Sequence, residues 1–159
     1  MSTLLLLLAA CASHAPVAPE PAAALVEPVP APPPEPGIND NFLDPNMDVE
    51  QWVERFGAES REVVARQPEI MAAMALSPGA AVADIGAGTG LYTAAFAEAV
   101  GPEGQVYAVD ISPVFLERLR GMAADDSWSQ VRVVEATATS SELDAGSIDA
   151  AFVCDTYHH

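Results

Sequence analysis

The chain has 159 residues and a formal net charge of −17, with six arginines and no lysine. This length leaves room for one domain. The acidity excludes the basic stripe that binding to a nucleic-acid backbone requires. We therefore predict no nucleic-acid partner and interpret the negative charge mainly as a solvated surface.

The first residues have the pattern of a targeting segment. An apolar run that ends at Ala10 precedes Cys11, and it is too short to span a bilayer but long enough for the core of a signal peptide. The letters LAAC at residues 8–11 resemble the lipobox of bacterial lipoproteins, which implies a signal peptide over residues 1–10 and a lipid on the Cys11 sulfur. No positive charge precedes the apolar run, which departs from the usual pattern. An ordinary cleaved secretory signal or a frayed apolar terminus is the alternative.

Residues 11–38 are dominated by proline and alanine, a composition that forms neither helix nor sheet. Such a segment extends by about 3.1 Å per residue in the polyproline II conformation. It is typical of a tether that holds a domain away from a membrane, and a disordered extension is the alternative. The lipobox and the tether together imply an exported protein that is lipid-anchored to a bacterial membrane and faces the periplasm. If the signal interpretation fails, a cytoplasmic protein is expected.

From residue 39 to residue 159 helical and strand patterns alternate, which predicts an α/β domain with a parallel sheet. Helices come first, capped by Asp48 and by Ser60, and a third helix opens at Pro68. The first of these carries Trp52 and Phe56 on one face. Strands are predicted at 81–85, 105–110, 131–136 and 148–155, with helices that begin near residues 91 and 112 between them.

A glycine-rich loop follows the first predicted strand, where residues 84–90 read DIGAGTG. The absence of lysine excludes a P-loop, and Leu91 stands where the dinucleotide fingerprint needs a small residue. The pattern D/E-x-G-x-G-x-G matches at every defined position, and it resembles motif I of class I S-adenosylmethionine-dependent methyltransferases. Glycines let the backbone turn sharply and approach a ligand, while the following helix N-terminus offers N–H groups to a carboxylate.

The resemblance covers about residues 61–159 and implies S-adenosyl-L-methionine as the cofactor. It implies that Asp84 suits the ammonium end of the cofactor, that Asp110 accepts from both ribose hydroxyls, and that Ile111 lies against the adenine. Thr137 stands where the family often has an aspartate, and its hydroxyl accepts more weakly than a carboxylate. The full implied cofactor-binding set is Asp84, Gly86, Ala87, Gly88, Gly90, Asp110, Ile111, Thr137 and Asp155.

The family fold is a Rossmann-like, doubly wound parallel sheet of seven strands in the order 3-2-1-4-5-7-6. This sequence supplies patterns for strands one to four, so we expect a partial methyltransferase domain that is truncated after motif IV. The crevice between strands one and four, where the strand order reverses, would still be present for the cofactor. The apolar letters AAFV at residues 150–153 do not alternate, which is typical of a central strand.

The sequence assigns no general base, and Asp155, Tyr157 and His158 are only weak catalytic candidates. The neighbouring His158 and His159 point to opposite faces of an extended chain, so we predict no metal site there. We predict methyl transfer to a small-molecule acceptor by in-line attack, with catalysis mostly by positioning. The alternative is a non-catalytic, lipid-anchored binding or interaction module that retains the cofactor loop as a scaffold. The pattern specifies neither the acceptor nor the oligomeric state.

Overall fold

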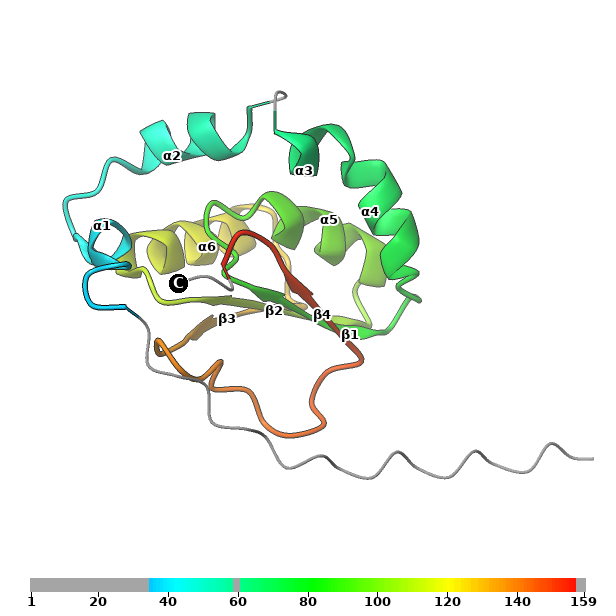
Figure 1. The fold of residues 1–159 in the computed structure, drawn as a ribbon. Coiled ribbons are helices and arrows are strands. Elements are labelled where there is room, and N and C mark those ends of the chain that lie inside the picture. The colour runs from blue at the N-terminus through cyan, green and yellow to red at the C-terminus, as the bar shows by residue number, and fades with distance from the viewer. Residues whose placement is uncertain (1–34, 59–60, 157–159) are drawn as a thin grey trace, which may run out of the picture. The chain divides into compact units, whose positions relative to one another are not determined.

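The protein is described here by a computed structural model, which places residues 35–58 and 61–156 (Figure 1). Its centre is a parallel sheet of β1 (Ala81–Ile85), β2 (Gln105–Asp110), β3 (Val131–Glu135) and β4 (Ala150–Val153), in the order β3-β2-β1-β4. This is the order that the resemblance implies for strands one to four. The predicted α/β fold, with its partial set of strands, is therefore confirmed. β1 and β2 have their predicted bounds, whereas β3 and β4 are shorter than predicted.

Two helices lie on the same face of the sheet, α5 (Leu91–Val100) after β1 and α6 (Pro113–Asp125) after β2 (Figure 1). Ser112 caps α6 by accepting from the Phe115 N–H, and Pro113 follows in the first turn, as the Ser-Pro pair predicts. Residues 136–149 cross the opposite face of the sheet and contain no helix. The described part of the chain therefore carries helices on one face of its sheet.

The core lies between the sheet and these two helices. Val82 and Val106 on the strands and Phe96 on α5 are fully buried, as is Leu116 on α6. Burial of apolar side chains of this size supplies most of the favourable free energy of folding, at roughly 1.5–3 kcal/mol each. The apolar side chains of these strands and helices therefore hold the two helices against the sheet.

The N-terminal part is helical, with α1 (Asp40–Leu43), α2 (Val49–Phe56), α3 (Glu62–Ala65) and α4 (Gln67–Met74). Asp48 caps α2 as predicted, because its carboxylate accepts from the N–H groups of Glu50 and Gln51. The predicted cap Ser60 lies outside the described residues, and α1 has no counterpart in the sequence prediction. None of these four helices contains a buried residue. Val63 on α3 and Ile70, Met71 and Met74 on α4 are partly buried and pack against the core.

No helix in residues 35–58 and 61–156 has the length and apolar character needed to cross a membrane. The predicted signal peptide at residues 1–10, the lipidation candidate Cys11 and the tether up to residue 34 lie outside the described residues.

Candidate functional site

The carboxyl ends of the strands form the floor of a cavity of 1440 Å³. The strand register places Ile85 at the end of β1 beside Val109 and Val153, so the crevice between β1 and β4 opens here. The cavity collects most of the predicted cofactor-binding residues, namely Asp84, Gly86, Ala87, Gly88, Asp110, Ile111, Thr137 and Asp155. Residues far apart in sequence are therefore brought to one place, and their role in binding stays a prediction.

The backbone conformation of the glycine loop explains why glycine stands at three of its positions. The φ values are positive at all three glycines, +73° at Gly86, +53° at Gly88 and +87° at Gly90. Residues that carry a Cβ atom are strained in this region. The N–H groups of Gly86 and Ala87 donate to the Val109 carbonyl at 2.8 and 3.0 Å. The loop is thus held against the end of β2.

Gly90, alone among the predicted cofactor-binding residues, is absent from the cavity wall. A Cβ atom at Gly90 would lie 3.0 Å from Met122 and 3.1 Å from Leu119 on α6. Its small size allows close packing of α6 against the start of α5, which is a structural requirement distinct from contact with a ligand.

Asp110 organises the loop from the end of β2. Its Oδ2 atom accepts from the Gly88 N–H and its Oδ1 atom from the Ser112 N–H, both at 2.8 Å. Burial raises the pKa of this carboxyl group, and the N–H donors of Ser112, Gly88 and Ile111 oppose that rise. Each carboxylate oxygen can accept more than one hydrogen bond. Asp110 can therefore bind hydroxyl groups in the cavity while it holds the loop.

Asp84 lies deeper than the sequence suggests, with 3% of its surface exposed. Its Oδ2 atom accepts from the Thr93 hydroxyl on α5 at 2.7 Å. Burial raises the pKa of Asp84 to about 7, Thr93 opposes the rise, and the nearby charge of Asp110 adds to it. A positively charged ligand group in the cavity would favour the ionised form.

This raised pKa predicts that the free energy of unfolding falls as the pH rises from about 4 to about 7. In this window the unfolded chain releases the Asp84 proton while the folded chain retains it. The stabilisation that protonated Asp84 gives to the folded chain is therefore complete below pH 4 and lost at about pH 7. The change amounts to a few kcal/mol. Urea denaturation of wild type and Asp84→Asn between pH 4 and pH 8 measures it. Equal pH slopes for the two proteins would contradict the assignment.

The remaining predicted residues lie near the outer rim. Thr137 is exposed, and its hydroxyl accepts from the Thr139 N–H at 3.3 Å. Asp155 follows β4 with a positive φ of 51° and forms an ion pair with Arg61. Burial raises the pKa of the neighbouring Cys154 thiol, which disfavours the nucleophilic thiolate. The candidates Tyr157 and His158 lie outside the described residues.

An aromatic wall that sequence reasoning did not assign to the site lines one side of the cavity. Phe42, Trp52, Phe56 and Phe115 all line it, with ring centroids 5.1 Å apart for Phe42–Trp52 and Trp52–Phe56 and 6.2 Å for Phe56–Phe115. We call the first three of these residues the aromatic cover. The spacing of Trp52 and Phe56 on one helix face was visible in the sequence, but the surface that they meet was not.

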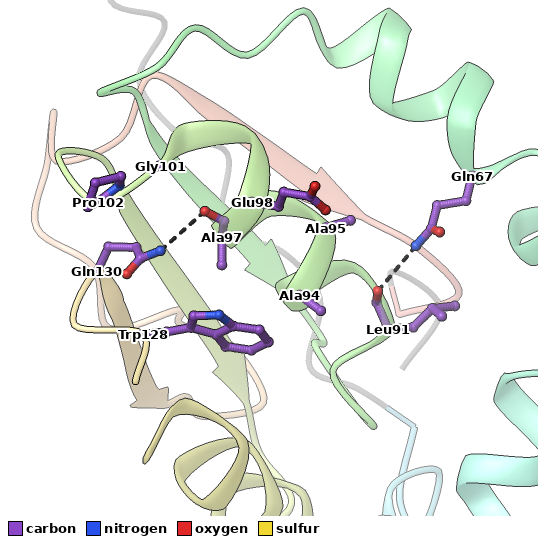
Figure 2. Close-up of a pocket in the computed structure, with 10 residues that line it drawn as sticks. All are labelled: Gln67, Leu91, Ala94, Ala95, Ala97, Glu98, Gly101, Pro102, Trp128 and Gln130. Carbon is purple, nitrogen blue, oxygen red and sulfur yellow. Dashed lines mark hydrogen bonds between the residues drawn. The ribbon is translucent and has the colours of Figure 1, made fainter. Parts of the chain in front are cut away.

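A second cavity, of 680 Å³, lies on the outer side of α5 (Figure 2). Its amide side chains are already engaged, because Gln67 donates to the Leu91 carbonyl and Gln130 to the Ala97 carbonyl. Much of its remaining wall is alanine beside the Trp128 ring. This cavity therefore presents few free polar groups, unlike the cavity at the glycine loop.

Within the described ranges no three side chains of histidine, cysteine, aspartate or glutamate are arranged to hold a metal ion.

Residues 82–159 match a family model described as a methyltransferase domain. No curated protein matches the chain. The matched segment begins in β1 and includes the glycine loop, Asp110 and Asp155. The similarity thus falls on the elements that build the cavity floor.

Several solved structures are similar to the chain. A SAM-dependent methyltransferase from Aquifex aeolicus is 22% identical with a TM-score of 0.48, over 57% of this chain and 47% of that one. A SAM-dependent O-methyltransferase from Thermotoga maritima is 22% identical with a TM-score of 0.42, over 50% of this chain and 31% of that one. The [4+2]-cyclase SpnF is 23% identical with a TM-score of 0.48, over 55% of this chain and 33% of that one. The chain therefore spans less than half the length of each of these structures.

Proposed function

We propose that this domain binds S-adenosyl-L-methionine in the 1440 Å³ cavity and transfers its methyl group to a small-molecule acceptor. The observation that carries the proposal is the convergence of Asp84, the glycine loop and Asp110 on one cavity, with the Gly88 N–H bonded to Asp110.

The residues present fit this cofactor. The atoms nearest to a Cβ atom at Gly88 would be those of the Phe56 ring, at 3.6 Å, and the Gly86 carbonyl oxygen, at 3.9 Å, so the glycine keeps the backbone clear of a side chain of its own on the cavity wall. Asp110 would hold the ribose hydroxyls, and Asp84 would lie near the positively charged amino-acid end. When bound, the cofactor supplies an electrophilic methyl group on a sulfonium.

The work of this chain is mostly positioning. The carboxylates stabilise positive charge on one side of the cavity, and the aromatic cover shields the other side from water. Asp84, the glycine loop and Asp110 would hold the cofactor, which would supply its methyl group to the acceptor and leave as a neutral thioether. A base is needed only when the acceptor must lose a proton, and Asp155 is the described candidate at the cavity rim.

Calorimetric titration of the full chain with S-adenosylhomocysteine tests the proposal. We expect saturable binding with one ligand per chain. A folded chain that binds none at millimolar ligand would contradict it and would support the alternative of a non-catalytic module that retains the loop as a scaffold.

We further propose that the protein is exported and lipid-anchored through Cys11, with residues 11–38 as the tether. The LAAC letters and the proline-rich segment behind them support this proposal. Labelling cells with a radioactive fatty acid should mark the wild type and not Cys11→Ser. Equal labelling of both proteins would refute it.

A further inference from the structure

We propose that Arg61 is a clasp that holds the aromatic cover closed over the glycine loop, and that release of this clasp admits the cofactor. The second half of this proposal rests on the function proposed above, and the first half does not.

One side chain makes three contacts at this point. The Arg61 guanidinium pairs with the Asp155 carboxylate, donates to the Phe56 carbonyl at 3.2 Å, and lies 5.1 Å from the centre of the Phe56 ring. Asp155 lies two residues after the end of β4, whereas Phe56 is the last residue of α2. The Arg61–Asp155 pair spans 94 residues of sequence, and both residues line the cavity.

The clasp acts on the part of the cover that faces the glycine loop. The Phe56 ring lies 3.6 Å from the position that a Gly88 Cβ would occupy. Beyond Asp155, the Thr156 side chain lies directly against Gly86. A ligand that contacts the Gly88 backbone would therefore lie beside Phe56, and Arg61 links this residue to the segment that follows β4.

The cover is able to open while the core stays folded. Helices α1 and α2, which carry the cover, contain no buried residue and contribute none of the partly buried side chains that pack against Val82 and Phe96, whereas α5 and α6 contain several buried residues. Other contacts that hold this region include the Tyr92 hydroxyl on the Val63 carbonyl at 2.7 Å and the Arg118–Glu50 ion pair at 3.6 Å. Segments with few buried contacts open locally at a lower free energy than global unfolding requires.

Hydrogen exchange of the unliganded full chain tests the clasp. In Arg61→Gln we expect amides of residues 50–57 to exchange about threefold faster or more, with those of β2 unchanged. Arg66→Gln is the matched control, because Arg66 forms exposed pairs with Glu62 and Glu69 on the same segment and touches neither β4 nor Phe56. Equal acceleration in both variants, or none in Arg61→Gln, would overturn the clasp.

Asp155→Asn tests the same ion pair from its other partner. Asparagine suits this position because it tolerates the positive φ. If the two residues act through one contact, the double variant Arg61→Gln/Asp155→Asn should exchange no faster than Arg61→Gln alone. Arg61→Lys should be intermediate, because lysine keeps the charge but loses the planar fork that also reaches the Phe56 carbonyl. Additive effects would show that Arg61 and Asp155 act separately.

Stopped-flow binding of S-adenosylhomocysteine tests the second half. Arg61→Gln should raise both the association and the dissociation rate by about threefold or more, because the open cover is populated more often. Unchanged rates with faster exchange would refute the role in admission and keep the clasp. A chain that shows the exchange result but binds no S-adenosylhomocysteine would refute the proposed function alone.

Discussion

Replacing Asp110 by alanine is expected to weaken S-adenosylhomocysteine binding roughly tenfold or more. The substitution removes the acceptor proposed for the ribose hydroxyls. It also leaves the Gly88 and Ser112 N–H groups, which now donate to this carboxylate at 2.8 Å, without their partner. Loss of the contact to the ribose hydroxyls would lower the affinity directly. Loss of the Gly88 and Ser112 hydrogen bonds would free the glycine loop, which the ligand must contact.

Calorimetry on wild type and Asp110→Ala measures the effect, with circular dichroism to establish equal folding. Glu135→Ala is a suitable control, because Glu135 pairs with Asp110 in the register of β2 and β3 but is exposed and does not line the cavity. If a folded Asp110→Ala bound as tightly as this control, the assignment at the end of β2 would be wrong.

Replacing Gly86 by alanine is expected to abolish detectable binding. A Cβ atom there would lie 2.7 Å from the Thr156 Cβ and closer still to its hydroxyl and methyl groups, so the residue after β4 would have to move. The positive φ of +73° adds backbone strain of order 1 kcal/mol. Because Thr156 follows the ion-paired Asp155, the displacement would also disturb the cavity rim.

Thr156→Gly separates these two causes, because it removes the atoms that a Cβ at position 86 would meet and leaves the backbone strain in place. Calorimetric titration should show no binding for Gly86→Ala and partly restored binding for Gly86→Ala/Thr156→Gly. Gly79→Ala is the control for alanine at a positive φ, because Gly79 has a φ of +86°, nothing lies within 4 Å of its Cβ position and it does not line the cavity. No recovery in the double variant would show that strain, and not the contact with Thr156, decides the outcome.

The elements that local patterns define were predictable from the sequence. β1 and β2 end where an apolar run meets the glycine loop and Asp110, and Asp48, Pro68 and Ser112 mark helix starts by their own hydrogen-bonding chemistry. Most of the candidate site follows from these ends, because the carboxyl termini of adjacent parallel strands meet at one edge of the sheet.

The rest of the site depends on contacts between distant segments. Arg61 and Asp155 carry no mutual signal in the sequence, and the aromatic rings of α2 could equally have packed into a core. The three glycines of the loop look alike in the motif, but packing against Met122 and Leu119 turns Gly90 toward α6. Tertiary packing decides which of these glycines lines the cavity, and a local pattern does not contain that information.

Helices α1 and α2 contain no buried residue, and none of their side chains is among those that pack against the core around Phe96. A substitution on these two helices therefore costs less stability than one at a buried position of α5 or α6. At Phe42, Trp52 or Phe56 the same substitution alters the wall of the cavity directly, because these residues line it. This wall is therefore free to diversify over generations of mutation, while the glycine loop and its carboxylates stay under the constraints of the fold.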